Sequence, residues 1–222
     1  MTTEPLALSA LGFLLGIRHA TDADHVVAVA TIACRERRAR AAMAIGALWG
    51  LGHTATILLV GSAIILFDAA IPPRLGLSLE MAVAVMLVLL GVLNLARAVP
   101  HHPESSRGPA RRGGRLRPLA IGVVHGLAGS GAIGLLVLTT IRSAGWAIVY
   151  LIVFGAGTVL GMMLMTTAMA FPLAAAARRF GTLERGIARV TGAVSVIFGA
   201  FLAYRLGVVD GLFSVAPRWT PR

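Results

Sequence analysis

The chain alternates long apolar stretches with short polar segments. A membrane-spanning helix needs about 20 mostly apolar residues, and six stretches reach that length: residues 6–34, 42–67, 79–99, 118–141, 146–170 and 187–208. Over all 222 residues 57% are hydrophobic and 13% are charged, whereas a soluble domain carries about 25% charged residues. The pattern therefore predicts an all-α polytopic membrane protein with six transmembrane helices.

The basic residues indicate how these helices are oriented. All 20 of them are arginine, and the formal net charge is +11. The first, third and fifth connecting loops each carry several arginines, whereas the second and fourth carry one each, Arg74 and Arg142. By the positive-inside rule the odd loops are cytoplasmic and both termini lie outside. This distribution predicts a multi-pass protein of the cytoplasmic membrane in contact with lipid, and not a nucleic-acid-binding protein.

The chain divides into two halves of similar pattern. Residues 1–99 form the first three-helix half, residues 100–117 an Arg-, Pro- and Gly-rich cytoplasmic linker, and residues 118–222 the second half. Residues 16–19 match 122–125, residues 51–53 match 156–158 and residues 91–97 match 199–205, at nearly constant offsets. Because each half has three spans, the second inserts upside down. The pattern predicts two inverted three-helix repeats, a frequent build of secondary transporters.

A cluster of ionisable residues interrupts the first apolar stretch. His19, Asp22, Asp24 and His25 follow Arg18 within eight residues. Each charge at membrane depth costs about 3 kcal/mol on insertion scales, so a bound cation, a proton relay or an ion-pair network must compensate. In a regular helix His19, Asp22 and His25 share an arc of about 120° and Asp24 faces elsewhere. Asp24 then either faces another helix, supports the site indirectly, or lies where the helix is distorted.

Imidazole and carboxylate ligands together suit divalent ions such as Ni²⁺, Co²⁺ and Zn²⁺. We therefore interpret His19, Asp22, Asp24 and His25 as candidate metal ligands. His53 joins them as a candidate, since its flanking glycines would let another helix approach closely. In the second half His125 occupies the position of His19, and Ser130 follows it in a Gly-rich stretch. We expect His125 and Ser130 to line the pathway of the ion.

The string from Arg18 to Val26 resembles the His-x4-Asp-His signature of the nickel/cobalt transporter family, and residues 51–54 resemble its second signature. The compact arrangement, with residues 125–130, is similar to the short urease-accessory-type nickel permeases and to six-helix nickel/cobalt efflux proteins. The resemblance implies a permease for Ni²⁺ or Co²⁺, with His19, Asp24 and His25 as its signature residues. The metal would be a transported substrate and not a permanent cofactor. A metal-enzyme maturation system, such as that of urease, would be the partner.

The sequence thus predicts a secondary permease and not an enzyme. Without lysine the chain has no phosphate-binding loop of the Gly-x4-Gly-Lys type, and moving a dication through 100 mV supplies about 4.6 kcal/mol. Two alternatives stay open. The spacing His19-x4-Asp24 also resembles that of membrane acyltransferases, and a non-transporting subunit of a metal-uptake complex is the third interpretation. Ni²⁺ or Co²⁺, uptake or efflux, and monomer or homo-oligomer are not distinguished.

Overall fold

The computed structural model describes residues 3–33, 36, 38–67, 71–97, 116–128, 141, 143–179 and 183–219. Within these residues the regular structure is entirely helical, as predicted. The helices, in chain order, are α1 (Thr3–His19), α2 (Ala23–Ala33), α3 (Ala39–Phe67), α4 (Pro73–Arg97), α5 (Leu116–Leu127), α7 (Ala144–Arg179) and α8 (Leu183–Tyr204), and a π-helical turn, η2 (Arg205–Val209), follows α8.

Four of these helices, α3, α4, α7 and α8, are long and apolar enough to cross a membrane. They correspond to the second, third, fifth and sixth predicted spans. The first predicted span, residues 6–34, is not one helix but two shorter ones, α1 and α2. The fourth begins as α5, and its remainder at residues 129–140 lies outside the described residues, as does the linker up to residue 115. Six spans therefore stay a prediction.

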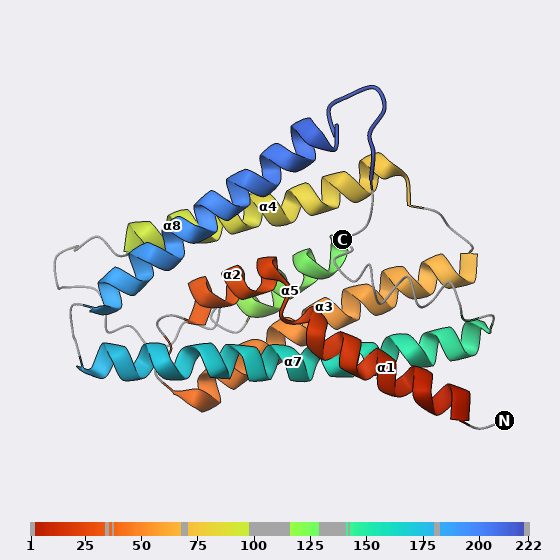
Figure 1. Ribbon diagram of the computed structural model, residues 1–222, viewed down its shortest axis with the longest axis horizontal. Coiled ribbons are helices and arrows are strands. Elements are labelled where there is room, and N and C mark those ends of the chain that lie inside the picture. The colour runs from red at the N-terminus through yellow and green to blue at the C-terminus, as the bar shows by residue number, and fades with distance from the viewer. Residues whose placement is uncertain are drawn as a thin grey trace.

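The helices associate in pairs. Helix α4 packs along α8, and α3 packs along α7 (Figure 1). Helix α1 lies against α7, and α5 lies against α3. The short α2 contacts α4, α7 and α8, and α5 also contacts α4, so these two short helices lie between the two long pairs.

Glycines bring α1 close to α7 and α5 close to α3. At each of four glycines, an added Cβ would collide with a backbone carbonyl oxygen of the facing helix: Gly16 with Phe154, Gly157 with Phe13, Gly122 with Trp49 and Gly52 with Leu119. Small residues of this kind let membrane helices approach backbone to backbone. They fix the depth at which the ends of α1 and α5 meet the long helices.

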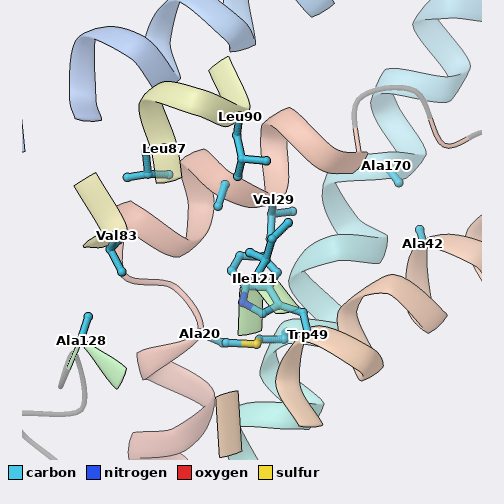
Figure 2. Close-up of a cluster of buried hydrophobic side chains, with 12 residues drawn as sticks. Ala20, Val29, Ala42, Trp49, Val83, Leu87, Leu90, Ile121, Ala128 and Ala170 are labelled. Carbon is cyan, nitrogen blue, oxygen red and sulfur yellow. The ribbon is translucent and has the colours of Figure 1, made fainter. Parts of the chain in front are cut away.

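Apolar side chains pack α2 against its neighbouring helices. Figure 2 shows Val83, Leu87 and Leu90 of α4 on one side of α2, and Trp49 of α3 and Ile121 of α5 on the other. This cluster is continuous and buried. It holds the N-terminal end of α2, with its ionisable residues, inside the bundle.

The chain beyond η2 folds back onto the beginning of α4. The indole N–H of Trp219 donates to Oε1 of Glu80 at 2.8 Å, and the indole lies over Gly76, where a Cβ would collide with the ring. The Arg74 guanidinium donates to the carbonyl of Ser214 at 3.2 Å. These contacts fasten the last described residues to one end of the α4–α8 pair.

Candidate metal site

The site begins where α1 ends and α2 starts. The backbone N–H of Thr21 donates to the carbonyl of Arg18 at 2.8 Å and that of Asp22 to His19 at 3.1 Å, which closes α1 with a tighter turn. Regular helical bonding resumes when Val26 donates to the carbonyl of Asp22. The helix is therefore broken at the ionisable cluster. Of the alternatives that the sequence left for Asp24, the structure has both the distortion and the contact with another helix.

His19 lies at the end of α1 and is held from both sides of its ring. Its Nδ1–H donates to Oδ2 of Asp22 at 2.7 Å, because a carboxylate only accepts. In this tautomer Nε2 carries a lone pair, and it faces Nε2 of His53 on α3 at 3.0 Å. Asp22 is partly exposed, whereas His19 is buried. Asp22 therefore orients His19 toward His53.

His25 is held in the same way by its neighbour. The backbone N–H of His25 and its ring Nδ1–H both donate to Oδ1 of Asp24, at 2.9 and 3.0 Å. The ring is fully buried, and in the part of the chain that the structure describes its Nε2 has no hydrogen-bond partner. With the proton on Nδ1, this Nε2 is a buried lone pair free to bind a cation.

The other oxygen of Asp24 reaches the second predicted half of the chain. Its Oδ2 lies 3.4 Å from Nε2 of His125 on α5. His125 is fully buried, and neither of its nitrogens has a well-aligned hydrogen bond within the described residues. A buried imidazole whose polar contact is this weak is costly, which favours a ligand role for His125.

Two overlapping groups of donor atoms result. In one, His19, His25 and His53 offer ligand atoms within 4.8 Å of one another, and in the other Asp24, His25 and His125 do the same. We name them the three-histidine group and the aspartate group. The structure thus brings together all the candidate residues except Asp22, which contacts His19 from behind, and Ser130, which lies outside the described residues.

Aromatic rings line the cluster, and sequence reasoning did not single them out. The indole of Trp49 on α3 stacks on His25 with ring centroids 5.6 Å apart, and lies 5.4 Å from the ring of His125. Phe154 on α7 lies 5.7 Å from His19. Trp49 precedes His53 by four residues and so lies on the same helix face. That spacing is a sequence signal that could have found it.

The donor set suits a divalent transition metal. Bonds of about 2.0–2.1 Å from an ion to two neighbouring imidazoles place the nitrogens roughly 3.0–3.4 Å apart, and His19 and His53 already stand at 3.0 Å. Nitrogen donors with one nearby carboxylate favour Ni²⁺, Co²⁺ or Zn²⁺ over Mg²⁺ and Ca²⁺, which prefer oxygen.

Comparison with known proteins finds a relative of similar length. The chain is 37% identical over 220 residues to the urease accessory protein UreH of Bacillus sp. (strain TB-90), and the alignment covers 95% of this chain and 96% of that protein. No protein-family model matches the chain. No solved structure matches it.

Proposed function

The chain belongs to the family of the urease accessory protein UreH, and we propose that it is a secondary permease that moves Ni²⁺ or Co²⁺ across the cytoplasmic membrane. One observation carries the proposal. Four histidines that are at most 5% exposed, with Asp24 among them, converge at a helix break inside a bundle of long apolar helices. Ionisable groups at such a place are expensive, and a transported cation compensates for them.

The helix break itself supports transport. Secondary transporters commonly bind their substrates where a membrane helix is discontinuous, because the free helix ends supply charge and backbone groups. Here α1 ends at His19 and presents the carbonyl end of its dipole, which favours a cation. The N-terminal end of α2 would repel a cation, and the carboxylate of Asp24 in its first turn offsets this.

Reciprocal contacts support the proposed inverted repeat. The offsets between the two halves relate one contact to another: the contact of Gly16 with Phe154 corresponds to the contact of Gly122 with Trp49. In the same way, the contact of Phe154 with the ring of His19 becomes that of Trp49 with the ring of His125. If the two halves resembled each other only by chance, equivalent residues would not be expected to make equivalent contacts. We propose that α1 and α5 are equivalent, each docked on a long helix of the other half.

The four long apolar helices support insertion as a multi-pass membrane protein. We further propose that the Arg-rich loops are cytoplasmic and that both termini lie outside, as the arginine distribution predicts. The metal would then cross at the level of the helix break, between α1, α2, α3 and α5.

The relative is named a urease accessory protein, and we propose that the present chain is likewise an accessory protein and not an enzyme. The acyltransferase alternative is therefore dropped. An acyltransferase also disagrees with the site. The ring of His19 is buried, contacts His53 and donates to Asp22, so it does not face a substrate in water. We propose that the permease supplies metal to a urease maturation system. A non-transporting subunit of a larger uptake complex remains the second candidate.

The test is metal flux into proteoliposomes that contain only this chain. We expect flux of Ni²⁺ or Co²⁺ with the wild-type protein and loss of flux with His25→Ala, because His25 belongs to both donor groups. His101→Ala, in the predicted linker, is the matched control and should transport like the wild type.

Equal flux with wild type and His25→Ala would contradict the site. A correctly inserted chain that moves no metal in either direction would favour the non-transporting subunit instead.

A further inference from the structure

The three-histidine group and the aspartate group share one residue, His25. Provided that the proposed transport is correct, we propose that the two groups are successive positions of a single cation, which passes from one to the other while it stays bound to His25. The chain would then hold one ion at a time at two adjacent places and not one ion in a single fixed site.

The bonding of His25 makes the two positions mutually exclusive. Asp24 accepts the proton on Nδ1 at 3.0 Å, and this leaves Nε2 as the free nitrogen. One lone pair binds one metal ion. While an ion is bound in the three-histidine group, His25 is not available to the aspartate group. While an ion is bound in the aspartate group, His25 is not available to the three-histidine group.

The two positions differ in charge and in the helices that form them. The three-histidine group takes its neutral imidazoles from α1, α2 and α3, whereas the aspartate group combines a carboxylate and two imidazoles from α2 and α5. The ring of His25 is close to all the others, with centroids 4.7 Å from His19, 5.1 Å from His53 and 4.7 Å from His125. A small displacement of the ion past His25 is therefore enough to exchange its remaining ligands.

This exchange keeps the ion coordinated throughout. As the bonds from His19 and His53 break, bonds from Asp24 and His125 form, and the bond to His25 persists. When the ion has moved, the ring proton of His53 returns from Nδ1 to Nε2, and this nitrogen again donates to Nε2 of His19 at 3.0 Å. No step leaves a bare dication in an apolar interior, where it would be strongly disfavoured.

The experiment uses the full chain in detergent, with Ni²⁺ alone as the probe. Binding is measured by calorimetry, and the imidazole ligands are counted by X-ray absorption at the nickel edge. We expect one Ni²⁺ per wild-type chain. His53→Ala should still bind one ion, now with two imidazoles and a carboxylate, and His125→Ala should bind one ion with three imidazoles.

Flux in proteoliposomes completes the test. Each of these two variants should still bind Ni²⁺ at the position that is left, but should lose at least about tenfold in flux, because the ion reaches only one of the two positions. His25→Ala should lose binding and flux together. Unchanged thermal unfolding, and repetition with His53→Gln and His125→Gln, exclude misfolding as the cause.

Two Ni²⁺ bound per wild-type chain would overturn the proposal, since the positions would then fill together. Identical ligand counts in His53→Ala and His125→Ala, or wild-type flux in either, would overturn it as well. A wild-type chain that binds Ni²⁺ in this way but transports none would contradict the permease and leave the two positions standing.

Discussion

The imidazole of His25 lies flat on the indole of Trp49, with 13° between the ring planes and 5.6 Å between the centroids. Trp49 is fully buried, and its other neighbour in the cluster is the ring of His125 at 5.4 Å. One residue of α3 therefore supports imidazoles that come from α2 and from α5. It restricts the orientation of the one ligand that both donor groups share.

Trp49→Ala should weaken Ni²⁺ binding by roughly ten- to a hundredfold, the effect typical of losing a residue that orients a ligand. It should also lower the free energy of unfolding by about 3–5 kcal/mol, because a large buried ring is removed. Trp49→Phe keeps a stacking surface and should recover most of both. Calorimetric titration and denaturant unfolding in detergent measure the two effects. An affinity for Ni²⁺ unchanged in Trp49→Ala would show that the stacking is only packing.

Asp22→Asn should lower Ni²⁺ affinity by roughly ten- to a hundredfold as well, but for an electrostatic reason. The carboxylate accepts the Nδ1–H of His19 at 2.7 Å and makes the opposite nitrogen a better donor to metal. Since Asp22 is partly exposed, stability should change little. Asp22→Glu, which keeps the charge, should restore part of the affinity. If Asp22→Asn binds Ni²⁺ like the wild type, the residue only terminates the helix.

Much of the site could be predicted from the sequence, because charge in an apolar stretch is conspicuous. His19, Asp24, His25 and His53 follow from that signal and lie together in the structure. The position of Asp24 could not be derived, since a regular helix turns it away from His19. The local break at residues 20–22 depends on hydrogen bonds that helical periodicity does not encode.

Which helices pair could not be predicted from the composition of the chain either. The glycines of α1, α3, α5 and α7 are evident in the sequence, but not which helix each one faces. Pairing depends on backbone shape at each crossing, and the structure brings Gly52 of α3 against the backbone of α5. Trp49 was overlooked because a buried aromatic residue in an apolar helix usually indicates nothing beyond packing.

Gly122→Ala should destabilise the protein by about 1–3 kcal/mol, the usual cost of overpacking. The new methyl group would collide with the carbonyl oxygen of Trp49 and push α5 away from α3. Gly186→Ala on α8 is the matched control, because, apart from its chain neighbours and its own helix backbone, no heavy atom of the described residues lies within 4 Å of its added Cβ. There, alanine should raise stability by up to about 1 kcal/mol through its helix propensity. Denaturant unfolding compares the two, and equal effects would contradict the close approach of α5.

Trp219→Phe should lower the free energy of unfolding by about 1–3 kcal/mol, because the buried carboxylate of Glu80 loses an indole N–H donor at 2.8 Å. Ni²⁺ affinity should not change, since Trp219 contacts the beginning of α4 and not the histidine cluster. Thermal unfolding and calorimetry on the same preparation separate the two quantities. A loss of affinity without a loss of stability would be the contrary result.

Single cysteines should reveal the predicted orientation of the chain. With Cys34 first replaced by serine, a membrane-impermeant maleimide added to intact cells should label Pro72→Cys and Ser143→Cys, because the arginine-poor loops are expected outside. Arg40→Cys should react only after the membrane is permeabilised. All three native residues are exposed, so their accessibility depends on the membrane and not on burial in the protein. Labelling of Pro72→Cys and Ser143→Cys from opposite sides would rule out the inverted repeat, since an inverted second half requires both loops on one side.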